Sequence, residues 1–355
     1  MNKINRTTFI FLAIFLTINC QLGLAQRPYR TGTTTANFLE IGMGSDGLAM
    51  GDAFVSMGGN LSSLYWNPAG LAFLKQNEVM FGYQPLVVDI NSAYAAGAIL
   101  LPPYGNLAFG FFNVDYGDMK VTTLDMQDGT GELFTANEYA FTFSYSRKLA
   151  QWFSFGVSAK YISSQIWHTK ASATALDLGV IVNTHFFAPA GSKENGMKIG
   201  MSISNYGTKM RYDGMDLLQL IDIEPDEAGN YSAVPGQFKT HEWELPLIFR
   251  IGVSVNPILT QNHRLTLSMD ALHPNNNSES LNLGVQYEFR LPGTGSFFLR
   301  GGYRGLFLND SEYGVTYGGG LMLRFMNNYA IRTDYAFKTM GVLGNTNSYT
   351  VGILF

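Results

Sequence analysis

An alternation of apolar and polar residues runs through most of the chain and predicts β-strands rather than helices. In the segment 139–146, tyrosine and phenylalanine occupy every second position, and alanine, threonine and serine occupy the positions between them. The same division recurs at 153–161, 281–290 and 329–337. A strand that alternates in this way has two faces in different surroundings, one apolar and one polar.

Segments with this two-residue period continue to the end of the chain and predict a closed barrel. Most have about the 9–11 residues with which a tilted strand crosses a bilayer. An even number of antiparallel strands closes without a free edge, which the hydrocarbon interior requires. We therefore predict an all-β fold, a fourteen-stranded antiparallel transmembrane β-barrel over residues 78–355. The predicted strands lie at 78–90, 92–101, 106–116, 137–148, 153–165, 173–187, 197–206, 244–256, 263–271, 279–290, 297–306, 314–326, 329–338 and 346–355.

The connections between these segments alternate in length, which predicts how the barrel sits in a membrane. Short turns such as 102–105 and 150–152 alternate with longer, more polar loops such as 117–136 and 207–243. Outer-membrane barrels have short turns in the periplasm and longer loops outside. Counting from the first strand places both mature termini in the periplasm of a diderm bacterium.

The loop 207–243 is the largest insertion between the predicted strands. Its segment Met215–Ile221 predicts a short amphipathic helix, and acidic residues follow at Glu224–Glu227. An exposed apolar patch with a charged rim would suit a protein partner. The same segment can equally fold back and cap the barrel, and the sequence does not separate these two arrangements.

Composition narrows the class of protein to which such a barrel belongs. The 355 residues carry a net charge of −4 and only 14% of them are charged, against about 25% in an average soluble domain. Aromatic residues reach 14%, while the mean hydropathy of +0.03 is too low for a bundle of membrane helices. These values favour an outer-membrane β-barrel surrounded by lipid, and no basic excess indicates a nucleic-acid partner.

The first 25 residues have the pattern of a secretory signal peptide. Two basic residues precede an apolar stretch at 9–18, and small residues stand at the −3 and −1 positions before Gln26. That stretch is too short to cross a membrane as a helix, so we expect residues 1–25 to be removed. The only cysteine, Cys20, lies in this segment, which predicts no disulfide and no thiolate chemistry in the mature protein.

Residues 26–77 lack the two-residue period, and we predict that they fold inside the barrel as a plug. Glycines recur through Leu39–Asn60 with apolar residues between them, and glycine allows two backbones to approach closely. Further along, Asn67 and Pro68 predict a helix start, with asparagine as the N-cap and proline at the first helical position.

The residues around this helix start form the first candidate site. We expect the two aromatic side chains ahead of it to wedge against the barrel wall. The element then anchors the plug, or it lines a ligand pocket or a lateral exit, and the two roles are compatible. The candidate residues are Tyr65, Trp66, Asn67, Pro68, Ala69 and Gly70.

Charged residues on the face that alternation directs into the lumen form the second candidate site. A charge inside a low-dielectric wall needs a partner, so we expect a ladder of cross-strand salt bridges, joined by Glu40, Asp46 and Asp52 of the plug. The alternative is a lumen that holds an anionic head group or a carboxylate tail. The predicted lumen charges are Lys160, Asp177, Arg250, Asp270, Glu288, Arg300, Arg304, Arg324, Arg332 and Asp334.

The sequence carries no signature of catalysis, metal binding or cofactor binding. The five histidines are scattered without the spacing of metal ligands, and no Gly-x-Ser-x-Gly nucleophile elbow occurs. We predict a protein without a metal, a cofactor or enzymatic activity. A hydrolase assembled from distant strands of the barrel is a third possibility.

Two segments ahead of the predicted barrel carry a family resemblance. The glycine-rich segment 38–56 and the segment 63–72, which contains Asn-Pro-Ala, resemble the N-terminal signature of the PorV/PorQ family. That family belongs to the broader FadL-type outer-membrane barrels, which share the Asn-Pro-Ala element. The resemblance implies a fourteen-stranded barrel with an N-terminal hatch. PorV-like sequences tend to have lysine after this element, where this chain has Gly70, as the wider group does.

The resemblance implies two functions, which different members of the group divide between them. FadL-type members import hydrophobic molecules and pass them sideways through the barrel wall. PorV-type members collect secreted proteins at the outer membrane for the type IX secretion system. We predict the second function, with secreted cargo proteins or secretion-system subunits as partners. The alternative is a FadL-type channel whose ligand is a hydrophobic small molecule.

Overall fold

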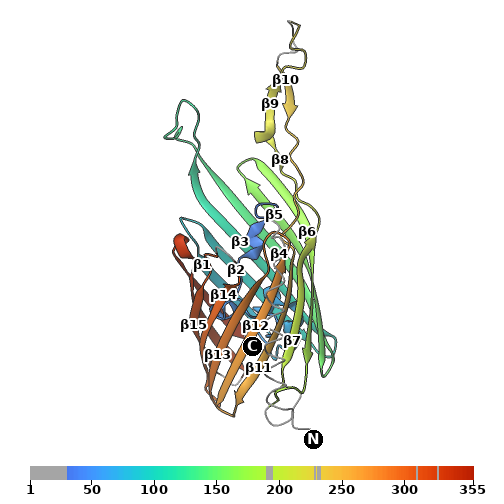
Figure 1. Ribbon diagram of the computed structural model, residues 1–355, viewed down its shortest axis with the longest axis vertical. Coiled ribbons are helices and arrows are strands. Elements are labelled where there is room, and N and C mark those ends of the chain that lie inside the picture. Colours follow the sequence, from blue (N-terminus) through green and yellow to red (C-terminus); the bar gives the residue numbers. More distant parts are fainter. Residues whose placement is uncertain (1–29, 189–194, 228, 230–232, 309–310, 326–327) are drawn as a thin grey trace, which may run out of the picture.

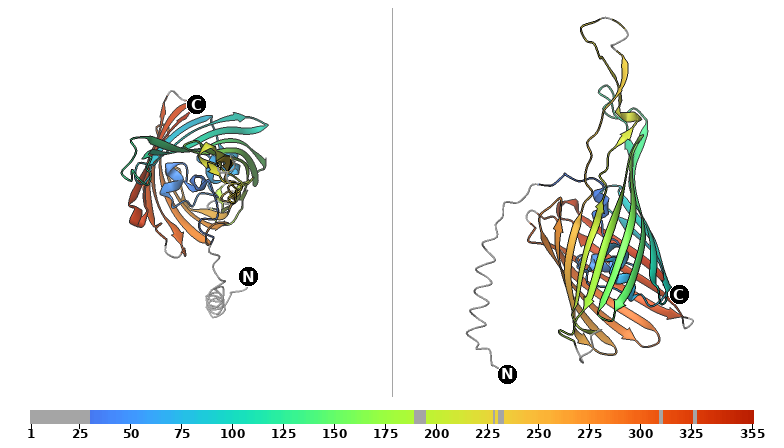
Figure 2. Two further views of the ribbon diagram at one scale, coloured as in Figure 1. Left: turned by 90° about the horizontal axis from the view of Figure 1, so that it is seen from above. Right: turned by 90° about the vertical axis from the view of Figure 1, so that its right-hand side faces the viewer.

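The computed structural model describes residues 30–188, 195–227, 229, 233–308, 311–325 and 328–355, so the predicted signal peptide lies outside the described residues. Within these residues, fourteen antiparallel strands close into a barrel (Figures 1 and 2), which confirms the predicted fold. The barrel strands are β1 (Glu78–Pro85), β2 (Asn91–Leu101), β3 (Gly105–Lys120), β4 (Leu133–Ala150), β5 (Phe153–Ile166), β6 (Thr169–Asn183), β7 (Lys198–Gly207), β11 (Ile248–Leu259), β12 (His263–Pro274), β13 (Ser280–Leu291), β14 (Gly295–Leu306), β15 (Val315–Phe325), β16 (Tyr329–Thr339) and β17 (Asn345–Leu354).

Pairing of the first strand with the last closes the ring. The register between β1 and β17 runs from Glu78 opposite Leu354 to Tyr83 opposite Tyr349. The side chains alternate as predicted, since outward phenylalanines of β4 are about half exposed while the inward Ser144 is fully buried. The outer face suits lipid, and the inner face packs against the segment that fills the lumen.

Strands β3–β6 extend further toward the long-loop end than β11–β15 (Figure 1). Strand β6 begins at Thr169 instead of the predicted 173. In 169–175 its polarity is inverted, because the alanines point inward and are buried while lysine, serine and threonine point outward. Polar outer positions indicate that this part of the wall stands in water above the lipid.

The longest loop carries a two-stranded arm in place of the predicted amphipathic helix. After β8 (Asp213–Gly214) there is one 3-10 turn, η5 (Met215–Leu217), and then β9 (Leu218–Ile221) pairs with β10 (Val234–Gln237). We call the described part of residues 215–238 the arm, which stands beyond the long-loop end of the barrel (Figures 1 and 2). The helix prediction was wrong because so short a helix is unstable in water unless it packs against something.

The described residues 36–77 lie inside the barrel (Figure 2, left view). Four short helices form this plug: η1 (Asn37–Glu40), α2 (Ser45–Ala49), α3 (Ser63–Trp66) and η2 (Pro68–Phe73). Their apolar side chains make two buried clusters, one within the plug and one against the wall of β2–β6. In the described part of the chain, no helix has the length and apolar character to cross a membrane.

The first described residues and the C-terminal residue lie at opposite ends of the barrel. Thr34 forms a parallel bridge with Glu244, and Asn276 donates a hydrogen bond to Thr34 Oγ1 at 3.0 Å, both at the long-loop end. At the short-turn end, the backbone N–H of Phe355 donates to the carbonyl of Asn77 at 3.0 Å. The segment around Thr34 thus lies at the opposite end from the C-terminal residue, whereas the sequence predicted both mature termini at one end. Gln26, the predicted first mature residue, lies outside the described residues.

Candidate functional site

Asn67 attaches the middle of the plug to the barrel wall. Its side chain is fully buried, and Nδ2 donates to the carbonyl oxygens of Val55 at 2.7 Å and of Val180 in β6 at 3.1 Å. Its Oδ1 accepts a hydrogen bond from the N–H of Ala69 at 3.1 Å, as the predicted N-cap of the helix that begins at Pro68. One side chain therefore caps a helix and anchors that helix to the wall.

Glycine forms the wall beneath Asn67. A Cβ on Gly179 of β6 would overlap Asn67 Oδ1, and a Cβ on Gly156 of β5 would overlap the backbone of Pro68. The plug backbone therefore lies directly against the barrel wall, which residues without a side chain allow. Other wall glycines whose Cβ would overlap the plug are Gly110, Gly200, Gly252, Gly284, Gly302 and Gly318.

Tyr65 and Trp66 pack mainly inside the plug. The Trp66 ring lies against Gly47, and its Nε1 donates to the carbonyl of Met43 at 2.9 Å. The two rings meet edge to face with centroids 4.8 Å apart. The guanidinium of Arg250 from β11 lies 5.7 Å from the centre of the Tyr65 ring. Instead of the expected wedge against the wall, these rings form a core of the plug, which Arg250 of β11 and the buried Ala336 of β16 join from the wall.

Position 70 has no room for a side chain. A Cβ on Gly70 would lie 2.6 Å from Ser63 Oγ and 3.0 Å from the carbonyl oxygen of Met57. The backbone N–H of Gly70 also donates to the carbonyl of Asn67 at 2.9 Å. The glycine that follows Asn-Pro-Ala, where PorV-like sequences tend to have lysine, is thus required by the packing of η2.

A buried chain of four charged side chains connects the plug to the wall. Arg332 of β16 forms ion pairs with the Asp46 carboxylate of α2 at 2.8 Å and with the Asp334 carboxylate at 2.6 Å. Asp334 also pairs with Arg300 of β14 at 2.6 Å. Strand β15 separates these two strands, and its Gly320 leaves room for the pair to meet. Positive and negative charges alternate along the chain, so each has a partner.

Two further ion pairs neutralise buried charges of the predicted lumen set. Lys160 bridges β5 and β6 through Asp177 at 2.7 Å. Arg304 of β14 pairs with Asp52 of the plug at 2.9 Å. The predicted cross-strand ladder is therefore in part a set of bridges between the plug and the wall, because the plug supplies carboxylates where the wall supplies arginines.

Other charged side chains of the predicted set bond neutral groups. Asp270 accepts a hydrogen bond from the N–H of Val55 at 2.8 Å, which is a second wall contact of that plug segment. Arg250 donates to Ser204 Oγ at 3.1 Å. Among the predicted plug acids, Glu40 accepts from Asn276 at 2.7 Å rather than from a cation.

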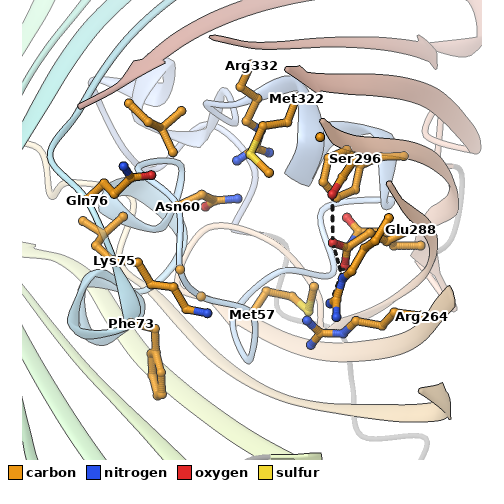
Figure 3. Close-up of a pocket in the computed structure, with 18 of the residues that line it drawn as sticks. Met57, Asn60, Phe73, Lys75, Gln76, Arg264, Glu288, Ser296, Met322 and Arg332 are labelled. Carbon is orange, nitrogen blue, oxygen red and sulfur yellow. Dashed lines mark hydrogen bonds and ion pairs between the residues drawn. The ribbon is translucent and has the colours of Figure 1, made fainter. Parts of the chain in front are cut away.

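Below the plug, at the short-turn end, lies a cavity of about 1000 Å³ (Figure 3). The plug contributes apolar side chains such as Met57 and Phe73, and the wall contributes mostly polar and basic ones. Glu288 lines the cavity in an ion pair with Arg290 at 2.7 Å. Arg324 is exposed on its wall, whereas the candidate residues Tyr65–Gly70 are not part of its lining.

The inner face of β2–β6 is apolar where it packs against the plug. Phe112 and Ile162 are buried there, and Phe38 of the plug stacks on Phe112 with ring centroids 5.9 Å apart. Alternation did not reveal this sector because most of its inward residues are alanines, which contribute little apolar signal. The buried alanines of the sector are Ala98, Ala108, Ala140, Ala171, Ala173 and Ala175.

Hydrogen bonds fasten the base of the arm to the turn between β5 and β6. Asp216 accepts from the backbone N–H of His168 at 3.0 Å, and its other oxygen lies 2.9 Å from His168 Nδ1. Thr169 Oγ1 donates to the same carboxylate at 3.2 Å. The hydrogen bonds from His168 lower the pKa of Asp216 below its ordinary value of 3.8.

Acidification is expected to release the base of the arm. Because the pKa of Asp216 is depressed in the folded protein, its stabilising contribution is complete above the unfolded value of about 3.9 and is lost as the pH falls through the folded pKa. Hydrogen exchange, corrected for intrinsic rates, should show protection of the arm at neutral pH and its loss in acid. The variant Asp216→Asn should lose that protection at neutral pH, whereas Asp226→Asn, an exposed carboxylate in the arm, should keep it. Equal protection in the two variants would contradict this role.

Two of the histidines each face a single polar side chain. His263 lies 2.7 Å from the Tyr287 hydroxyl, and His273 lies 3.0 Å from Glu279, both on exposed sites. Within the residues that the structure describes, no group of three His, Cys, Asp or Glu side chains is placed to hold a metal ion.

The plug, the first seven barrel strands and the base of the arm together match one family. Residues 24–222 match the family model described as type IX secretion system protein PorV. The chain belongs to the PorV family. The matched part covers the plug, β1–β7 and the first strand of the arm. No curated protein matches the chain.

Several solved structures share the fold of this PorV-family chain. The Pseudomonas putida toluene transporter TodX is 12% identical with a TM-score of 0.53, over 88% of this chain and 96% of that chain. The CymD monoaromatic hydrocarbon channel is 12% identical with a TM-score of 0.56, over 88% and 97%. A Pseudomonas aeruginosa FadL homologue is 11% identical with a TM-score of 0.52, over 88% and 98%.

Proposed function

We propose that this PorV-family barrel is a non-enzymatic component of a type IX-like secretion system that binds exported proteins at the outer membrane. The arm carries this proposal. Leu218, Leu220 and Ile221 of β9 are 53%, 70% and 40% exposed. The two-stranded sheet that they belong to is separate from the barrel sheet, so its outer edges are available to another chain.

The chemistry of the arm fits a protein partner better than lipid. Acidic side chains at Asp222, Glu224, Asp226 and Glu227 follow β9 directly, and all are exposed. Carboxylates are costly in hydrocarbon, whereas an apolar patch with a charged rim is typical of a protein interaction site. An extended partner segment can add to the sheet edge through its backbone and bury the leucines with its side chains.

The orientation that we propose places the arm outside the cell. Short turns face the periplasm and long loops face outward in outer-membrane barrels. The arm and the segment around Thr34 are then extracellular, and the C-terminal residue is periplasmic. Exported proteins or secretion-system subunits would meet the arm at the cell surface.

A channel for hydrophobic small molecules is the second candidate, and the apolar inner face of β2–β6 favours it. That sector packs against plug side chains, among them Phe38 and Leu39. A ligand there would have to displace plug side chains, since the residues that line the sector are already buried against one another. The residues that favour a channel lie outside the arm, so the two functions can be tested separately.

Native mass spectrometry of the barrel, extracted gently from its own outer membrane, tests the proposal. We expect a co-purifying exported polypeptide or secretion-system subunit. The variant Leu218→Ser/Leu220→Ser should lose it, because burial of each leucine contributes about 1.5–3 kcal/mol, or tenfold or more in affinity.

The matched control carries serine at Leu124 and Met126, which are exposed apolar residues of the loop between β3 and β4 at the same end. It should keep the partner. Retention of the partner by the arm variant would remove the arm from the interface. A bound lipid-like molecule without any protein partner would instead support the channel.

A further inference from the structure

The cavity below the plug has a strong excess of positive charge. Eight basic and two acidic residues line it. The acidic residues are Glu78 and Glu288, and both lie on barrel strands. The basic residues are Lys75, Lys148, Lys198, Arg264, Arg290, Arg300, Arg324 and Arg332.

Some of these cations are already neutralised. Arg290 holds Glu288 through two hydrogen bonds of 2.7 and 2.9 Å. Arg300 and Arg332 belong to the charge chain that ends at Asp46 of the plug. In contrast, Lys75, Lys148, Arg264 and Arg324 make no ion pair with any carboxylate in the described part of the chain.

The cations without an ion pair come from different sides of the cavity. Lys75 follows the plug helix η2, Lys148 is on β4, Arg264 is on β12 and Arg324 is on β15. Figure 3 shows Lys75 and Phe73 on the plug side of the space, facing Arg264 and Glu288 on the barrel wall. A single phosphate is best held by donors that converge on one point, whereas these donors are spread around a wide opening.

Apolar side chains line the cavity between the cations, and we call them its apolar surface. The plug contributes Phe54, Met57 and Phe73, and the wall contributes Met322. Lys148 stands 5.8 Å from the centre of the Phe73 ring, so apolar and cationic surfaces adjoin there. A ligand that matches both would carry several separated negative charges and apolar groups between them.

We propose that this cavity, which we call the basic basin, binds an acidic polypeptide segment that enters from the short-turn end. Spaced carboxylates of the segment contact the lysines and arginines around the cavity, and its apolar side chains pack against the apolar surface. The volume of about 1000 Å³ is at the upper end of the range for binding pockets. The basic basin lies at the opposite end of the barrel from the arm, so this inference does not depend on the function proposed for the arm.

Fluorescence anisotropy with the purified full-length barrel in detergent tests the proposal. The probe is a short fluorescein-labelled peptide with repeats of Glu-Ser-Leu-Glu, and its control has glutamine in place of glutamate. We expect saturable binding of the acidic peptide alone, weakened between about 50 mM and about 300 mM NaCl because salt screens exposed charges. The variant Lys75→Gln/Arg324→Gln should bind about tenfold more weakly, at about threefold for each charge removed.

The matched control is Lys120→Gln/Lys170→Gln, which removes the same charge from β3 and β6 at the long-loop end. It should bind the acidic peptide as the native protein does. Equal weakening by both double variants, or equal binding of the glutamine peptide, would overturn the proposal. Pyrophosphate is added as a competitor at the same total negative charge as the peptide. If it displaces the peptide, the basic basin binds phosphate groups, and the proposal of a polypeptide ligand is overturned.

Discussion

Replacement of Arg332 by methionine is expected to lower the free energy of unfolding of the plug by about 3–5 kcal/mol, the cost of breaking a buried ion pair. Methionine keeps much of the side-chain length but removes the guanidinium that pairs with Asp46 at 2.8 Å and with Asp334 at 2.6 Å. Arg300 still neutralises Asp334. The uncompensated charge therefore falls on Asp46, and helix α2 should leave the wall first.

Fluorescence of Trp66 during a guanidinium chloride titration measures this loss. The chain has four tryptophans, so Trp152, Trp167 and Trp243 are first replaced by phenylalanine. Trp66 is 2% exposed in the core of the plug and reports its release. Heat-modified mobility in gel electrophoresis reports the barrel separately, and it should not change because the strand ladders are intact.

The control for this experiment is Arg211→Met, which removes an exposed arginine that lies 3.7 Å from Glu242. An exposed pair contributes less than about 1 kcal/mol, so the plug transition should stay in place. Adding Asp46→Asn to Arg332→Met should recover part of the loss, because the orphaned carboxylate is removed. If both arginine variants gave the same small shift, the buried charge chain would not hold the plug.

The barrel could be predicted from the sequence because a strand between lipid and a packed lumen must alternate at every second residue. The run of aromatic residues at 139–146 shows this directly, and it lies within β4. The predicted start of β6 was less accurate, because there the strand no longer lies between lipid and the lumen. Beyond the lipid, the outer face of 169–175 meets water and its inner face meets the plug, so the pattern reverses with small alanines.

The partners of the lumen charges could not be predicted from alternation. Alternation places Arg332 and Asp270 on the inner face, but it does not say what lies opposite. Arg332 finds Asp46 of the plug, and Asp270 finds the N–H of Val55, at separations of hundreds of residues. Lys75 of the basic basin was missed because it follows the last helix of the plug, where no two-residue period applies. Lys148 was missed although it lies two positions beyond Ser146 on the inward face of β4.

The wall glycines support the same conclusion, because their role depends on what they face. In sequence, Gly179 and Gly301 are both glycines within predicted strands. In the structure, Gly179 lies under Asn67, whereas a Cβ on Gly301 would meet nothing closer than 3.7 Å. The difference arises only when the plug is folded into the lumen.

Replacement of Gly179 by alanine is accordingly expected to destabilise the plug by about 1–3 kcal/mol, the cost of overpacking a close contact. The new methyl group would overlap Asn67 Oδ1, so the asparagine must move and its bonds to Val180 and Ala69 must lengthen or break. Trp66 fluorescence in the single-tryptophan background should show release of the plug at lower denaturant, with the barrel unchanged in gel mobility.

The matched substitution Gly301→Ala should leave the plug transition in place, because both positions gain the same methyl group and only one of them faces the plug. The double variant Gly179→Ala/Asn67→Ala separates a clash from a general weakening of β6. If the clash is the cause, the two losses should be less than additive, because removal of the asparagine side chain frees the space that the methyl group needs. Additive losses would place the effect in the strand itself, and Gly179 would then have no special role in seating the plug.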